Sequence, residues 1–261
     1  MGFDTMQVKL NKLFGIEASR MQLYRAKKRC KEELEGDHRS QIFISFEAMK
    51  KWCIDGCKPI IWVDGCHLKG PYGGVLISAV ALDGDSLFPL ALAVVEGECK
   101  DSWTFFLENL RTIIEDALPS RPWTIMSNQQ KGLDKIVSDI IPEVTHRRCC
   151  MHLFNNFRAK FPRLILRKQF WKAIRAYNEK EYDQAMQSIK EISNDVFTWL
   201  QKVPVEGRSR HAFDDRIRCD HITNNMIESF NNWLGNMRCQ PILTMLENIR
   251  CKLKGKFQMR Y

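Results

Sequence analysis

Asp64 is the residue of this sequence whose type and position most clearly suggest chemistry. It follows four apolar residues at positions 60–63 and precedes Gly65, a pattern typical of a buried strand that ends in a single acid. An ionised carboxylate beside such a strand is costly to bury unless a metal ion, a cation or hydrogen bonds compensate its charge. Asp-Gly is also a common turn pair, so a turn without chemistry is the alternative interpretation.

Cys149 and His152 form a C-x-x-H pair. Structural zinc takes four ligands, so this pair is only half of such a site. Cys219 and His221 would complete a Cys₂His₂ set if the fold brought the two pairs together. The pair alone does not predict structural zinc.

Glu228 is a second acid that invites a functional interpretation. It lies in a stretch, residues 219–231, that leads into an expected amphipathic helix, with the acid set to one side of the apolar stripe. It also stands three residues after Asn225, so a role limited to capping the helix N-terminus is the alternative.

The composition limits the classes of protein and partner. The sequence has 40 Lys and Arg against 31 Asp and Glu, a net charge of +9, which favours a polyanionic partner, nucleic acid first. Ten Cys without an apolar N-terminal signal segment indicate a reduced compartment. No uncharged apolar run approaches the length of a membrane span, so we expect no membrane association.

The spacing of apolar residues predicts an α/β domain. Three strands with tight connections favour an antiparallel meander, and a helix, a strand, a second helix and a last strand follow. This is the order of an RNase H-like fold: a mixed sheet of a three-strand antiparallel meander plus two further strands, flanked by helices. In that fold the residue after the fourth strand, here Asn128, lies beside the end of the first. The expected strands are residues 60–65, 74–82, 88–96, 123–127 and 144–149.

The domain organisation follows from these elements. We expect a helical N-terminal remnant with a basic run at residues 25–31, an RNase H-like core, a basic helical insertion before the last acid, and C-terminal helices that complete the core. The predicted boundaries are 1–52, 53–152, 153–215 and 216–261.

The predicted insertion is strongly basic. No acid occurs between Glu143 and Glu179, and aromatic residues are interleaved among the cations. Neutralising several phosphates with such residues would give strong, salt-sensitive DNA binding; a solvated helix face over an aromatic core is the alternative. The predicted DNA-binding residues are Arg147, Arg148, Arg158, Lys160, Arg163, Arg167, Lys168, Lys172 and Arg175.

Six motifs in one order resemble the plant Mutator-like element (MULE) transposases, over roughly residue 53 to the C-terminus. The pieces are residues 64–70, 93–96, 101–103, 130–133, 149–153 and 223–231. The resemblance implies an RNase H-like DDE domain that cuts and rejoins DNA with two divalent cations, Mg²⁺ or Mn²⁺, held by three carboxylates. Two such cations activate an oxygen nucleophile and stabilise the leaving oxygen, and Mg²⁺ demands oxygen ligands.

Carried over by motif, Asp64 is the first acid, Glu228 the third, and Cys149 and His152 are the family's signature positions. Asp64 and Glu228 would be the metal ligands. The resemblance also implies DNA as the partner, a homo-oligomer on the DNA, and a nuclear location.

The sequence departs from the family at the second acid, where Asn128 replaces an Asp. An amide keeps a carbonyl oxygen but loses the charge, and Asp134 and Asp139 on the following helix are poorly placed to substitute. Cys99 stands where the family usually has Asn, and no zinc knuckle follows the last helix. We expect a catalytically degenerate transposase domain, or a domesticated DNA-binding or regulatory protein without catalysis.

Overall fold

The computed structural model describes residues 41–258, apart from residues 72, 85, 129, 218 and 220. The expected N-terminal helical segment and its basic run lie outside the described residues. The compact units of the chain divide between Ser40 and Gln41. Residues 41–52 therefore belong with the sheet and not with an N-terminal remnant that ends at residue 52.

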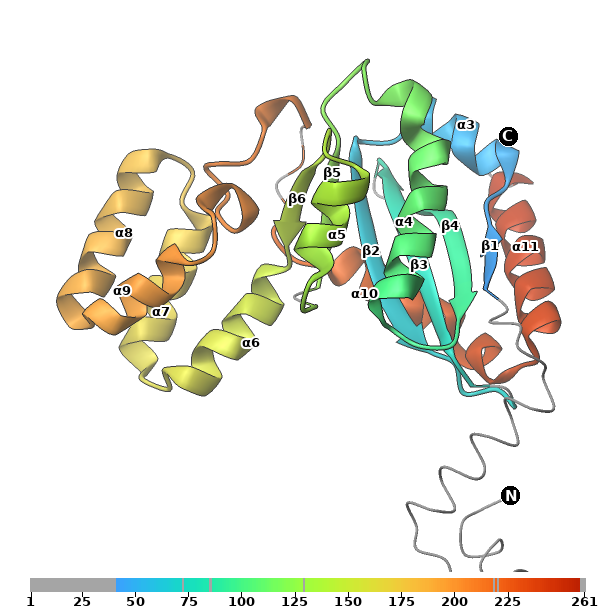
Figure 1. Ribbon diagram of the computed structural model, residues 1–261. Coiled ribbons are helices and arrows are strands. Elements are labelled where there is room, and N and C mark those ends of the chain that lie inside the picture. Colours follow the sequence, from blue (N-terminus) through green and yellow to red (C-terminus); the bar gives the residue numbers. More distant parts are fainter. Residues whose placement is uncertain are drawn as a thin grey trace, which may run out of the picture. The chain divides into compact units, whose positions relative to one another are not determined.

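One mixed sheet forms the centre of the described chain. Its strands are β1 (Ile42–Ile44), β2 (Ile60–His67), β3 (Val75–Asp83), β4 (Ser86–Val95), β5 (Thr124–Ser127) and β6 (Thr145–Arg148). Their order is β1-β4-β3-β2-β5-β6 (Figure 1). β2, β3 and β4 form the predicted antiparallel meander, whereas β2, β5 and β6 run parallel. The predicted α/β class and RNase H-like arrangement are confirmed.

Strand β1 was not among the five strands predicted from the sequence. It pairs antiparallel with β4 at the edge of the sheet, with Ile42 opposite Val94. Three residues are too few to show the alternation that identifies a strand. Pairing with a partner far along the chain creates this strand, so local sequence does not reveal it.

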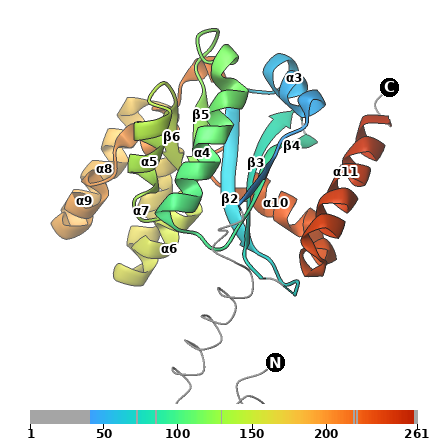
Figure 2. The ribbon, with the colours of Figure 1, turned by 45° about the vertical axis from the view of Figure 1, so that its right-hand side comes forward.

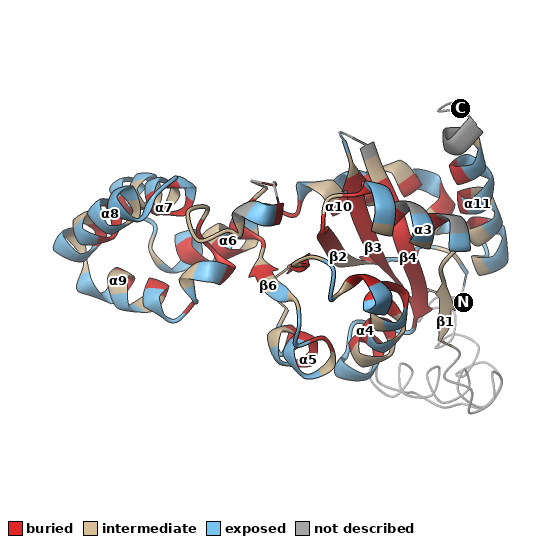
Figure 3. Cartoon of the chain, turned by 90° about the horizontal axis from the view of Figure 1, so that it is seen from above, coloured by how far each residue is buried: buried red, intermediate tan, exposed pale blue. Residues whose placement is uncertain are grey.

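Helices cover both faces of the sheet (Figures 1 and 3). They are α3 (Glu47–Gly56), α4 (Lys100–Ile114), α5 (Leu133–Ile140), α10 (Asn225–Leu234) and α11 (Ile242–Gln258), with short 3₁₀ turns η1 (Glu115–Ala117) and η4 (Gly235–Cys239). α4 and α5 lie on one face, and α10 and α11 on the other. Covering both faces explains why β2 and β3 are nearly continuous apolar runs.

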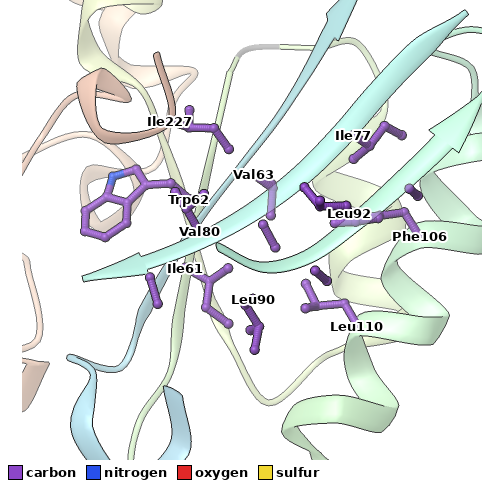
Figure 4. Packing of buried hydrophobic residues seen from close by; sticks show 14 of the residues in the cluster. Ile61, Trp62, Val63, Ile77, Val80, Leu90, Leu92, Phe106, Leu110 and Ile227 are labelled. Carbon is purple, nitrogen blue, oxygen red and sulfur yellow. The ribbon is translucent and has the colours of Figure 1, made fainter. Parts of the chain in front are cut away.

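The two faces of β2 pack against different helices. Trp62 lies on the side of Ile227 from α10, whereas Phe106 and Leu110 of α4 lie on the other side of the sheet (Figure 4). Alternate residues of a strand point to the same face. Asp64 therefore shares the α10 face with Trp62.

Four helices between β6 and α10 form a separate cluster beyond β6 (Figure 2). They are α6 (Cys150–Lys160), α7 (Leu164–Arg175), α8 (Glu179–Ile192) and α9 (Asn194–Gln201); η2 (Val205–Gly207) and η3 (Asp215–Ile217) follow. Phe157 and Phe170 are fully buried at its centre, 4.8 Å apart between ring centroids. The interleaved aromatic residues are thus mostly core. In the described part of the chain, no helix is long and apolar enough to span a membrane.

Candidate active site

Asp64 and Asn128 lie side by side, but Asp64 lies within β2, which continues to His67, and not at the end of the strand as expected, whereas Asn128 directly follows β5. β2 and β5 are parallel neighbours with Val63 opposite Ser127, so the next residue of each segment occupies the same position along the edge. Asn128 Nδ2 donates a hydrogen bond to Asp64 Oδ1 at 2.7 Å. The second predicted position is therefore in direct contact with the first.

Helix α10 supplies two more amides to this pair. Asn231 Nδ2 donates to Asp64 Oδ2 at 3.4 Å, and Asn224 Nδ2 donates to Asn128 Oδ1 at 3.0 Å. Asn231 belonged to a recognised motif but was not predicted as a site residue. The amides thus form a directed chain of donors that ends on the carboxylate.

Glu228 stands between these two asparagines in the sequence. It is four residues after Asn224 and three before Asn231, spacings that place side chains on one side of a helix. Its side chain is exposed. The N-cap of α10 is Asn224 and makes no side-chain capping bond, so the capping arrangement with Asn225 does not form.

The electrostatic surroundings of Asp64 oppose its ionisation. The pKa of the Asp64 carboxyl is raised to about 6, because burial and the charge of Glu98 outweigh the lowering by the Gly65 backbone N–H, His152 and the Asn128 hydrogen bond. Glu98 packs on Gly65, with its Cδ 2.7 Å from where a Cβ on Gly65 would lie. A side chain at position 65 would therefore displace Glu98.

Sequence reasoning missed Glu98 as a neighbour of the site. The signal was present: Glu98 follows β4, which runs in the same direction as β2 because both are antiparallel to β3. The carboxyl ends of β2, β4 and β5 therefore share one edge. An acid after any of these strands is a candidate neighbour of Asp64.

Ser127, His146 and Asp134 form a Ser-His-Asp series that could suggest nucleophilic catalysis. The Ser127 hydroxyl lies 2.8 Å from His146 Nε2, and His146 Nδ1 lies 3.1 Å from Asp134 Oδ1. Ser127 is fully buried, at 0% exposure, so no substrate reaches its oxygen. The series joins β5, β6 and α5 and is structural.

Asp134 is engaged by His146 and Arg148 and is not available to act in place of Asn128. Burial alone would raise the pKa of its carboxyl, but hydrogen bonds from His146 and Arg148 outweigh burial and hold this pKa at about 2. Arg148 donates to both Asp134 oxygens. These bonds tie the carboxylate to β6 and away from Asp64.

The C-x-x-H residues lie beside the candidate site. Cys149 is buried and its sulfur accepts the backbone N–H of Asn224 at 3.2 Å. His152 Nδ1 is buried without a hydrogen-bond partner. The ring of His221 packs on Trp62 instead of completing a set. Among the described residues, no group of three or more His, Cys, Asp or Glu is placed to hold a metal ion.

One predicted DNA-binding residue is wrong. Arg147 is only 2% exposed; it donates to the carbonyls of Glu206 and Ser209 at 2.6 and 2.8 Å and stacks on Phe213. Its buried side chain links β6 to η2 and to the loop that follows through these two hydrogen bonds, so it cannot reach a phosphate.

The other cations differ in their availability. Arg148 is engaged with Asp134 and Arg167 is partly buried. Six side chains on or next to α6 and α7 are exposed: Arg158, Lys160, Arg163, Lys168, Lys172 and Arg175. These six remain the candidate DNA-contacting set.

The mixed sheet, the contact between Asp64 on β2 and Asn128 after β5, and the helices inserted before α10 are consistent with an RNase H-like fold. The family model of the MULE transposase domain matches residues 60–156, from β2 into α6. This match supports the resemblance to Mutator-like element transposases over residues 60–156. A search of curated proteins found no match to the chain. The matched residues include Asp64, Asn128, Cys149 and His152 but end before Glu228.

Proposed function

We propose that this protein is a Mutator-like DNA transposase domain whose catalysis has degenerated through the change at position 128. The observation that carries the proposal is the 2.7 Å hydrogen bond from Asn128 Nδ2 to Asp64 Oδ1. A carboxylate only accepts hydrogen bonds, so the amide must turn its N–H, not its oxygen, toward an ionised Asp64.

The residues present do not fit two divalent cations. Such cations need several carboxylate oxygens at one place, whereas the two oxygens of Asp64 face N–H donors from Asn128 and Asn231. At an effective dielectric of ~20, losing one charge near a cation removes on the order of several kcal/mol. Because ~1.4 kcal/mol is tenfold in rate, a loss of about a thousandfold or more follows.

The test compares strand cleavage and strand transfer by the natural protein and by Asn128→Asp, each with Mg²⁺ and with Mn²⁺. We expect activity to appear only in the Asn128→Asp protein, and to be lost again when Asp64→Asn is added. Equal and robust activity of the natural protein and the Asn128→Asp variant would reject the degeneracy. Inactivity of both would mean that more than position 128 has been lost.

Binding of DNA without catalysis is the second candidate function, that of a domesticated DNA-binding or regulatory protein. It is supported by the six exposed cations of α6 and α7 and by the absence of acids between Glu143 and Glu179. This function requires neither metal nor Asp64. Salt-dependent binding of duplex DNA that is unchanged by Asp64→Asn is its expected signature. The proposal includes a nuclear location, where chromosomal DNA lies, and a homo-oligomer on the DNA.

A further inference from the structure

We propose that Cys149 is a positioning residue. Its thiol fixes the start of α10 against the ends of β5 and β6, and it thereby orients the side-chain amides of Asn224 and Asn128 toward Asp64. The role gives the C-x-x-H pair a function other than zinc binding. Its consequence for catalysis rests on the proposed function, but the hydrogen bond itself does not.

Cys149 stands where three segments meet. It is the N-cap of α6, and its backbone N–H donates to the Ser127 carbonyl at the end of β5 at 2.9 Å. The next backbone N–H, of Cys150, donates to the Ile222 carbonyl at 2.9 Å. The segment before α10 is therefore held at residue 222 through a backbone bond and at residue 224 through the Cys149 sulfur.

The second of these attachments depends on a side chain. Asn224 is fully buried, at 0% exposure, and its backbone N–H donates to Cys149 Sγ at 3.2 Å. A buried backbone N–H without an acceptor is strongly disfavoured. At the N-terminus of α10 no preceding helical carbonyl is available, so the sulfur supplies the acceptor that the fold otherwise lacks.

The attachment continues directly to the candidate site. The side chain of Asn224 donates to Asn128 Oδ1 at 3.0 Å, and Asn128 donates to Asp64 at 2.7 Å. Asn224 is thus held at its backbone by Cys149 while its side chain orients Asn128. Glu228 lies one helical turn after Asn224. The hydrogen bond from the Asn224 backbone N–H to Cys149 Sγ therefore fixes the N-terminus of the helix that carries Glu228.

A hydrogen-bonding role suits the chemical state of this cysteine. Burial raises the pKa of the Cys149 thiol above its ordinary value, despite backbone N–H groups of His152, Asn224 and Met151 that favour the thiolate. Zinc binds the thiolate. A protonated, buried thiol with an N–H on its sulfur is a structural acceptor.

The first test uses the natural protein and needs neither metal nor DNA. We expect the Asn224 amide to exchange with solvent as slowly as amides inside β5, although it lies before the first turn of α10. Exchange as fast as that of exposed loop amides would overturn the proposal. One equivalent of zinc bound through Cys149 in purified protein would overturn it as well.

Variants then separate this role from general packing. Cys149→Ala should speed exchange at Asn224 by about three- to tenfold, as expected for the loss of one hydrogen bond, and Cys149→Ser should restore part of the protection. Cys150→Ala is the matched control, because that buried thiol donates to the Arg208 carbonyl at 3.0 Å instead. An equal effect of Cys150→Ala at Asn224 would contradict the proposal.

The link to the site is measured separately, in the Asn128→Asp background. There Cys149→Ala should weaken Mn²⁺ binding, whereas Cys150→Ala should leave it unchanged. If the Asn128→Asp protein binds no Mn²⁺, the proposed function fails while the exchange results still decide the role of Cys149. Unchanged Mn²⁺ affinity in Cys149→Ala, with altered exchange, would limit Cys149 to a structural role.

Discussion

Asn128 bonds to Asp64 because the residues before them, Ser127 and Val63, are paired in register on adjacent parallel strands. With Asp at position 128, the same geometry would bring two carboxylates together, and such a pair needs a cation or a proton between them. With Asn, the amide N–H satisfies Asp64 directly. Asn at position 128 therefore forms a closed hydrogen-bonded pair with Asp64 where an Asp would require a cation or a proton.

The raised pKa of Asp64 predicts a pH-dependent stability. With its folded-state pKa at about 6, the folded protein holds the proton more tightly than the unfolded chain does. Stability is therefore greatest below about pH 4 for this group and falls as the pH rises to about 6. The free energy of unfolding of Asp64→Asn, relative to that of the natural protein, should therefore rise by on the order of 2 kcal/mol when the pH is raised from about 4 to about 7.

Denaturant unfolding of both proteins at the two pH values checks this difference. Asp139→Asn, at an exposed carboxyl on α5, is the matched control and should show a much smaller change. A difference between Asp64→Asn and the natural protein that does not vary with pH would mean that burial of Asp64 does not penalise its charge.

Arg147 should act on stability and not on DNA binding. Arg147→Ala leaves the carbonyls of Glu206 and Ser209 without their donors and opens a space beside Phe213. We expect a loss of about 3 kcal/mol in the free energy of unfolding, with Arg147→Met recovering part of the packing. An Arg147→Ala protein that keeps its stability but loses DNA affinity would restore the original prediction for this residue.

The exposed cations should instead determine the salt dependence of DNA binding. Replacing Lys168 and Lys172 of α7 by Gln should lower the slope of log K against log salt by about 0.9 for each phosphate that is no longer neutralised. Lys180 on α8 and Lys202 directly after α9 are both exposed. They are matched controls whose replacement by Gln should leave the slope unchanged. Equal effects of the two pairs would show that only net charge matters.

The sequence was informative where local pattern and position agree. The runs that became β2 and β3 are buried on both faces, so their apolar character identified them, and the motif order placed Asn128 beside Asp64. β1 was not predicted, because its three residues form a strand only through their pairing with β4. Arg147 was misassigned because a run of cations does not show which one points inward from a short strand.

A Mn²⁺ titration by calorimetry of the natural protein and of Asn128→Asp tests most directly whether the amide at position 128 keeps a cation out. We expect Asn128→Asp to bind Mn²⁺ at least about a hundredfold more tightly than the natural protein, and Asp64→Asn added to it to abolish this gain in affinity. Mn²⁺ binding by the natural protein with the same affinity as Asn128→Asp would show that the amide does not prevent the site from holding a cation.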